Sequence, residues 1–120
     1  MKRILLVEDD AIIALDLAQS MAEAGYDVLG PAARVAEALD LLRDSGCDAA
    51  VLDINLGEET SEAVAIELER RSIPFVTLSG YDADQQLPGF ARSESLVKPV
   101  RLETLKIALE ECMRSSRKSA

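Results

Sequence analysis

The sequence contains no histidine. This absence excludes Ser/His/Asp and Cys/His catalytic sites, histidine-ligated metal sites and a phosphohistidine on this chain. Tryptophan is also absent and aromatic residues make up only 3%, which disfavours stacking on nucleic-acid bases. Cys47 and Cys112 lie far apart, outside any C-x-x-C spacing, and indicate neither a disulfide framework nor a zinc site. Chemistry on this chain must therefore use carboxylates, hydroxyls and lysine.

The sequence also lacks a long hydrophobic run and an excess of basic residues. The apolar stretch near the N-terminus is too short for a signal peptide, and no run of about 18 apolar residues follows it. This favours a cytoplasmic protein without a membrane segment. The 13 Lys and Arg against 22 Asp and Glu give a net charge of -9, which disfavours nucleic acid and favours cations or basic partner surfaces.

The length of 120 residues leaves room for one domain, and a hydrophobic content of 48% is enough for a core of ordinary size. We expect this domain to cover residues 1–114. A flexible polar and basic tail is expected at 115–120. We expect no DNA-binding output module within this chain.

Five short apolar segments alternate with segments of helical periodicity. The apolar segments are Ile4–Val7, Tyr26–Leu29, Ala49–Leu52, Pro74–Leu78 and Ser95–Val97. Helical spacing follows each of them, although Pro88 and Gly89 leave only a short or irregular helix at 82–87. Strands that are aliphatic on both faces indicate a sheet covered on both sides. The sequence therefore predicts an α/β fold with a doubly wound parallel sheet of the (βα)5 type.

Local signals mark where these elements begin and end. Asp10 is the expected N-cap of the first helix, which should stop at Gly25. The pair Gly30-Pro31 is expected to close the second strand after Leu29, and residues 55–59 are expected to form a loop after the third strand.

Polar side chains follow four of the five predicted strands. Glu8 and Asp9 follow the first strand, Asp53 the third, Ser79 the fourth and Lys98 the fifth. In a parallel sheet these positions share the carboxyl edge, where open α/β sheets bind ligands. Each residue alone is more often a turn, cap or surface residue, so the prediction depends on their joint occurrence.

The acidic residues predict a metal site. In the flavodoxin-like strand order 2-1-3-4-5 the first and third strands are neighbours, which brings Asp9 and Asp53 together with Glu8 beside them. Three adjacent carboxylates repel one another unless a cation or a proton intervenes. Oxygen ligands favour Mg²⁺, and the backbone carbonyl of Asn55 is the candidate for a further ligand.

The remaining residues predict phosphoryl transfer. Asp53 is the candidate nucleophile beside the metal. The hydroxyl of Ser79 and the ammonium of Lys98 would bind the oxygens of the transferred phosphoryl group and stabilise its charge.

This set of residues resembles the receiver domains of bacterial two-component response regulators, and in particular a subgroup of often single-domain receivers. The resemblance covers Lys2 to about Met113. It implies an acidic pair, a phosphoacceptor, a metal-binding carbonyl, a switch hydroxyl and a phosphate-binding lysine, which are respectively Glu8 with Asp9, Asp53, Asn55, Ser79 and Lys98.

The resemblance also implies partners and a mode of action. The phosphoryl donor would be a phosphohistidine on a histidine kinase or a histidine phosphotransfer protein. The phosphorylated form would bind different partners, possible downstream effector proteins among them. Such a protein is a signalling phosphoacceptor that catalyses only its own phosphorylation and dephosphorylation, and is not an enzyme acting on other substrates.

Two positions depart from the pattern of most receivers. Gly57 stands where a proline usually follows the phosphoacceptor by four residues, and Ser95 stands where an aromatic switch residue is usual. Tyr81, two residues after Ser79, is the candidate substitute for that switch. These departures keep open a degenerate receiver that acts as a constitutive protein-binding module.

A further alternative is a small aspartyl-phosphate phosphatase. Such an enzyme would use a second carboxylate two residues after the nucleophile as a general acid. This chain has Asn55 at that position after Asp53, which ranks the phosphatase lower.

Overall fold

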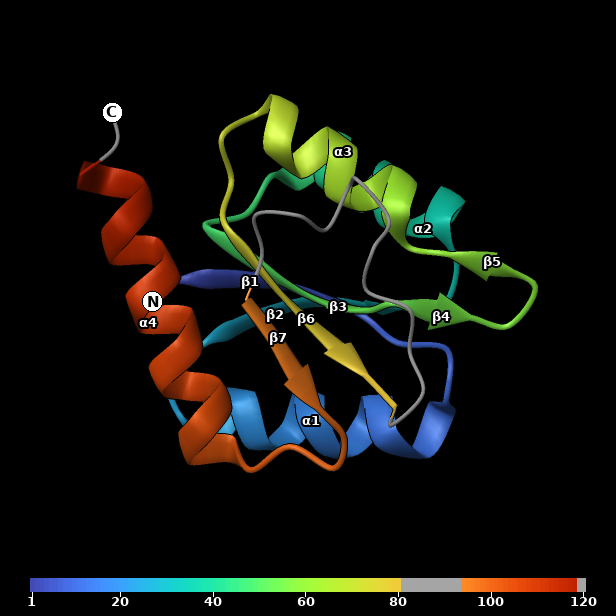
Figure 1. Ribbon diagram of the computed structural model, residues 1–120, viewed down its shortest axis with the longest axis horizontal. Coiled ribbons are helices and arrows are strands. Elements are labelled where there is room, and N and C mark those ends of the chain that lie inside the picture. The colour runs from blue at the N-terminus through green and yellow to red at the C-terminus, as the bar shows by residue number, and fades with distance from the viewer. Residues whose placement is uncertain (81–93, 119–120) are drawn as a thin grey trace.

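Five parallel strands form the central sheet of the computed structural model, which describes residues 1–80 and 94–118 (Figure 1). They are β1 (Arg3–Val7), β2 (Asp27–Ala32), β3 (Ala49–Asp53), β6 (Phe75–Ser79) and β7 (Glu94–Val97). Their order in the sheet is β2-β1-β3-β6-β7, and every neighbouring pair is parallel. A separate antiparallel hairpin contains β4 (Asn55–Leu56) and β5 (Glu59–Thr60). The predicted strand order 2-1-3-4-5 is therefore confirmed.

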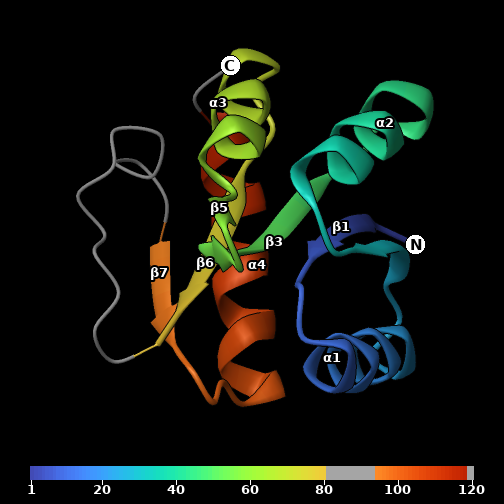
Figure 2. The ribbon, with the colours of Figure 1, turned by 90° about the vertical axis from the view of Figure 1, so that its right-hand side faces the viewer.

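Helices cover both faces of the sheet (Figures 1 and 2). On one face lie α1 (Ala11–Glu23) and α4 (Leu102–Lys118), and on the other lie α2 (Val35–Ser45) and α3 (Glu62–Arg70). Along β1, the side chains of Leu5 and Val7 belong to the core beneath α2 and α3, whereas those of Ile4 and Leu6 belong to the core beneath α1 and α4. Burial on both faces explains why this strand is aliphatic at successive positions.

The first helix begins as the sequence predicts. The side chain of Asp10 accepts hydrogen bonds from the backbone N–H groups of Ile12 and Ile13, at 3.0 and 3.1 Å. These bonds satisfy donors that the first turn of a helix leaves unpaired. The apolar spacing is a poorer guide to burial, because Ile12 and Leu15 remain 82% and 68% exposed.

The second strand is longer than predicted. It continues through Gly30 and Pro31 to Ala32, whose carbonyl accepts a hydrogen bond of 2.9 Å from the backbone N–H of Glu8. A proline is tolerated here because β2 is an edge strand, and the register with β1 also shifts near this point. The prediction that Gly30-Pro31 ends this strand is therefore wrong.

The last helix is also longer than predicted. It continues to Lys118, so the boundary expected at residue 114 lies within α4. Leu105, Leu109 and Met113 anchor its buried face. The short helix expected at 82–87 lies outside the described residues. Within the described ranges, no helix is both long and apolar enough to cross a membrane.

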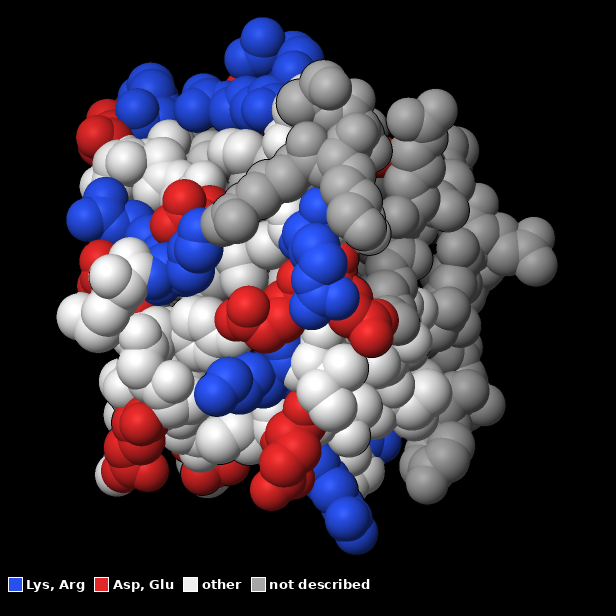
Figure 3. All heavy atoms as spheres, turned by 90° about the vertical axis from the view of Figure 1, so that its left-hand side faces the viewer, with Lys and Arg blue, Asp and Glu red and all other residues white. Residues whose placement is uncertain are grey.

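The amino edge of the sheet carries an exposed ion pair. Nε of Arg3 lies 3.0 Å from Oδ2 of Asp27, and the backbone N–H of Arg3 donates a hydrogen bond of 2.7 Å to Oδ2 of Asp48. The side chains of Arg3 and Asp27 are 44% and 46% exposed. Figure 3 shows the side of the molecule opposite the hairpin, where Lys and Arg side chains lie next to Asp and Glu side chains.

Candidate functional site

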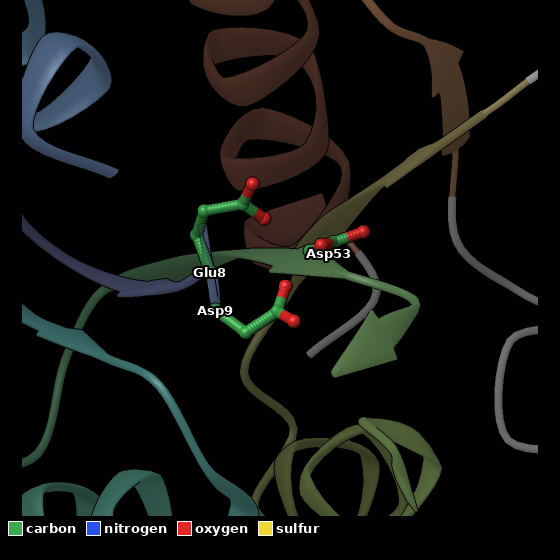
Figure 4. Close-up of side chains that lie close together, drawn as sticks. All are labelled: Glu8, Asp9 and Asp53. Carbon is green, nitrogen blue, oxygen red and sulfur yellow. The ribbon is translucent and has the colours of Figure 1, made fainter. Parts of the chain in front are cut away.

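Three carboxylates converge at the carboxyl edge of the sheet (Figure 4). Glu8 and Asp9 follow β1, and Asp53 is the last residue of β3. Because β1 pairs with β3 up to Val7 and Leu52, the next residues, Glu8 and Asp53, lie side by side. One oxygen from each carboxylate lies within 4.8 Å of the others. The structure thus brings together the acidic residues that the sequence singles out.

The three carboxylates differ in exposure. Glu8 and Asp53 are only 2% and 5% exposed, whereas Asp9 is exposed. Two carboxyl groups are therefore largely withdrawn from water, and the third borders solvent. Three oxygen donors so close together fit a hard cation such as Mg²⁺, which binds through a few carboxylates and retains several waters.

Lys98 joins the two buried carboxylates. Its Nζ lies 3.0 and 3.2 Å from the two carboxylate oxygens of Glu8 and 3.0 Å from Oδ2 of Asp53. The lysine follows β7, and its backbone N–H donates a hydrogen bond of 2.8 Å to the carbonyl of Ser79 at the end of β6. The Lys98–Pro99 peptide bond, which the sequence leaves open, is cis. Pairing between β6 and β7 therefore places the ammonium in the acidic cluster.

Burial changes how the cluster holds protons. Together with a hydrogen bond to Asp53, it raises the pKa of Glu8 to about 8, although Lys98 opposes the shift. Burial alone would lower the pKa of Lys98, but hydrogen bonds to Glu8 and Asp53 outweigh it and leave that pKa raised. The lysine therefore stays charged, and near neutral pH Glu8 is mostly protonated. A proton or a cation thus relieves the repulsion, as expected for crowded carboxylates.

The segment after Asp53 is a hairpin and not the loop that the sequence predicts. Leu56 pairs with Glu59, which leaves Gly57 and Glu58 as a two-residue connection. Such connections often need a positive φ at their first residue, and Gly57 has φ 77°. A Cβ built at Gly57 would lie 3.9 Å from Oδ2 of Asp9, so the hairpin tip lies beside the exposed carboxylate.

The other predicted residues lie at the same edge or outside the described ranges. Asn55 begins the hairpin with an exposed side chain, and its carbonyl as a metal ligand stays a prediction. Ser79 ends β6, fully buried, one residue after the position that pairs with Asp53. Tyr81, the candidate switch residue, lies outside the described residues. The proposed switch thus stays a prediction as well.

The comparison with known families agrees with this geometry. The family described as response regulator receiver domain matches residues 4–110. This chain belongs to that family. The match extends from β1 into α4.

Known proteins resemble this receiver in sequence and in structure. The transcriptional regulatory protein PdtaR of Mycobacterium tuberculosis is 31% identical over 114 residues, which cover 91% of this chain and 55% of PdtaR. The chain thus spans about half the length of the curated relatives that it matches. The crystal structure of a CheY-like receiver domain protein from Methanospirillum hungatei has a TM-score of 0.85 at 25% identity, covering 100% of this chain and 99% of that one.

A second solved structure has the same fold. The signal receiver domain of a modulated diguanylate cyclase from Desulfovibrio desulfuricans has a TM-score of 0.84 at 26% identity. The superposition covers 100% of this chain and 99% of the Desulfovibrio chain. The prediction of a receiver with a flavodoxin-like sheet is therefore confirmed.

Sequence reasoning missed one residue near the site of this receiver. Glu59, on β5, accepts a hydrogen bond of 3.0 Å from the backbone N–H of Val35 at the start of α2. The sequence offers only a weak signal for such a contact: Arg34, which the structure places at the N-cap, is not among the residue types that usually cap a helix. A helix that begins without a local cap needs a partner from elsewhere, but the sequence does not say which residue provides it.

Proposed function

We propose that this receiver accepts a phosphoryl group on Asp53 in a reaction that requires Mg²⁺. The observation that carries the proposal is the meeting of Asp53 with Glu8, Asp9 and Lys98 at one edge of the sheet. The residues that would hold the metal are Glu8, Asp9 and Asp53, together with the carbonyl of Asn55. When bound, Mg²⁺ would neutralise charge on the phosphoryl oxygens and orient the group.

In the proposed reaction a carboxylate oxygen of Asp53 attacks the phosphorus of a phosphohistidine. A phosphorus–oxygen bond forms, the phosphorus–nitrogen bond breaks, and the imidazole leaves after protonation. Lys98, which contacts Asp53 at 3.0 Å, would then pair with the phosphoryl oxygens. Ser79, at the end of the adjacent strand, would donate its hydroxyl to the same group. Attack of water on the acyl phosphate would later regenerate the carboxylate.

The proposed donor is a histidine kinase or a histidine phosphotransfer protein. These 120 residues contain no histidine, so the phosphohistidine must lie outside them. Membership of the receiver family supports partners of this class. The phosphorylated form would act by binding an effector protein. We further propose that the chain has no catalytic activity beyond its own phosphorylation and dephosphorylation.

The deciding experiment is intact-mass spectrometry after incubation with acetyl phosphate, with Mg²⁺ or with EDTA. We expect one added phosphoryl group on the wild type in Mg²⁺, none in EDTA and none on Asp53→Ala. Asp48→Ala is a matched control, because Asp48 precedes β3 at the opposite edge of the sheet and should leave labelling intact.

Two outcomes would contradict the proposal. Stoichiometric labelling of Asp53→Ala would show that another residue is the phosphoacceptor. If acetyl phosphate does not label the wild type and beryllofluoride, a mimic of the phosphoryl group, does not bind it either, the constitutive binding module would be favoured instead.

A further inference from the structure

The start of α2 depends on a residue from the hairpin. Arg34 occupies the N-cap with an extended backbone and no side-chain hydrogen bond, so the first helical N–H groups need other acceptors. The N–H of Val35 finds one in Oε2 of Glu59, 24 residues later in the chain, at 3.0 Å. A carboxylate at a helix N-terminus also interacts favourably with the helix dipole. The hydrogen bond between Val35 and Glu59 therefore has a charged acceptor, is partly buried and joins residues that are distant in the sequence.

The same residue holds one arm of the hairpin. Glu59 pairs with Leu56, whose side chain is 2% exposed and packs in the core beneath α2 and α3. At the base of the hairpin, the N–H of Ser61 donates to the carbonyl of Ile54 at 2.9 Å. One arm is thus fixed by packing of Leu56 and the other by the hydrogen bond of Glu59 to α2.

The hairpin borders the metal site at two points. Asn55, whose carbonyl is the proposed ligand, begins the first arm two residues after Asp53. At the tip, Gly57 lies beside the carboxylate of Asp9. Glycine restricts the backbone less than any other residue, so Gly57 does not itself fix the tip. A metal ligand has to be held to within about 0.5 Å, which requires restraint from outside the loop.

We propose that Glu59 is a positioning residue for the metal site. Its hydrogen bond to Val35 holds the hairpin on α2 and thereby fixes the Asn55 carbonyl relative to Asp9 and Asp53. This inference rests on the proposed function, because it assigns a role within the Mg²⁺ site. Its direct contact is with the backbone of α2, and its effect on the metal passes through the hairpin.

Two substitutions separate the reach of the Glu59 side chain from its charge. Glu59→Asp keeps the charge and shortens the side chain by one methylene, so the bond to Val35 is lost. Glu59→Gln removes the charge and keeps an acceptor oxygen at the same reach. We expect the Mg²⁺ dissociation constant, measured by ¹H–¹⁵N NMR titration, to rise roughly 10-fold in Glu59→Asp and to stay close to wild type in Glu59→Gln.

A matched control lies at the same end of α2. Glu37 accepts a hydrogen bond of 3.0 Å from the N–H of Ala33, and within the described part of the chain it makes no hydrogen bond to the hairpin. Glu37→Asp should therefore weaken the start of α2 and leave the Mg²⁺ dissociation constant unchanged. The same spectra report whether each variant is folded.

The outcomes distinguish this inference from the proposed function. If Mg²⁺ binding weakens equally in Glu59→Asp and Glu37→Asp, the hydrogen bond between Glu59 and Val35 acts only as a helix cap. That result would overturn the inference. If Mg²⁺ binding weakens in Glu59→Gln alone, the effect comes from the charge of Glu59, and this result would overturn the inference as well. If the folded wild type shows no saturable response to Mg²⁺, the proposed metal site itself fails.

Discussion

The two edges of the sheet use similar groups in different surroundings. At the amino edge, Arg3 pairs with Asp27 while both side chains are nearly half exposed. At the carboxyl edge, Lys98 pairs with Glu8 and Asp53, whose side chains are 0% and 7% exposed. The distances between paired atoms are the same, 3.0 Å in each case. Burial, and not contact distance, is the property that separates the two edges.

This difference shows how a functional site can arise from ordinary ion pairs. Water and salt screen an exposed pair, and each partner remains solvated if the other leaves. Water does not solvate a buried carboxylate in this way, which is why the pKa of Glu8 rises to about 8 even with Lys98 beside it. A cation or a phosphoryl group that enters the carboxyl edge therefore changes the free energy of the site substantially. At the amino edge the same event would change little.

Among the substitutions, removal of the Lys98 ammonium should produce the largest loss of stability. Lys98→Met leaves two buried carboxylates without their partner, and we expect the free energy of unfolding to fall by about 3 kcal/mol at pH 8 without Mg²⁺. Urea denaturation measures this change. Lys106→Met, on the exposed face of α4, controls for the loss of a lysine. Similar losses in the two variants would mean that the carboxyl edge is as well solvated as the surface.

The pH dependence of stability should reveal Glu8. Its pKa is raised from 4.5 to about 8 by burial, so the folded protein keeps a proton that the unfolded chain releases. The stability that this proton contributes is present below pH 4.5 and is lost as the pH rises toward 8. We expect the apo protein to lose up to about 1.4 kcal/mol per pH unit within that window.

Glu8→Gln provides the test, because glutamine does not titrate. Urea denaturation at a series of pH values should give a flatter profile for this variant than for the wild type. Asp27→Asn, at the amino edge, should keep the wild-type slope. A slope that survives in Glu8→Gln would assign the proton to a different group.

Much of the carboxyl edge could be predicted from the sequence because polar residues directly follow very apolar strands. Glu8, Asp53 and Lys98 each follow an aliphatic segment directly, and a parallel sheet brings such positions together. The burial of Glu8 and the pairing of Lys98 with it required the structure, because both depend on how neighbouring strand ends are packed.

The features that the sequence did not reveal depend on contacts between distant segments. Arg3 meets Asp27 and Asp48 across 24 and 45 residues, and no local pattern marks these partners. The hairpin arms are two residues each, too short for a periodicity to be recognised. The continuation of β2 past Pro31 depends on its place at the sheet edge, which a local turn signal does not report.

Mg²⁺ should stabilise the protein through the carboxyl edge alone. If the dissociation constant is about 1 mM, then about 10 mM Mg²⁺ should add roughly 1.4 kcal/mol by mass action, or about 5 °C in Tm. Thermal denaturation of Asp9→Ala should lose this increase, whereas Asp48→Ala should retain it. An equal increase in Asp9→Ala would place the bound cation outside the cluster.

Loss of the exposed ion pair should have the smallest effect. Arg3→Met removes a guanidinium that lies as close to Asp27 as Lys98 lies to Asp53. Because water solvates Asp27 once its partner is gone, we expect a loss of about 0.5 kcal/mol or less in urea denaturation, smaller still in high salt. The backbone N–H of Arg3 keeps its bond to Asp48 in this variant, so the strand end stays paired. A loss that approaches that of Lys98→Met would show that contact distance, and not burial, sets the strength of these pairs.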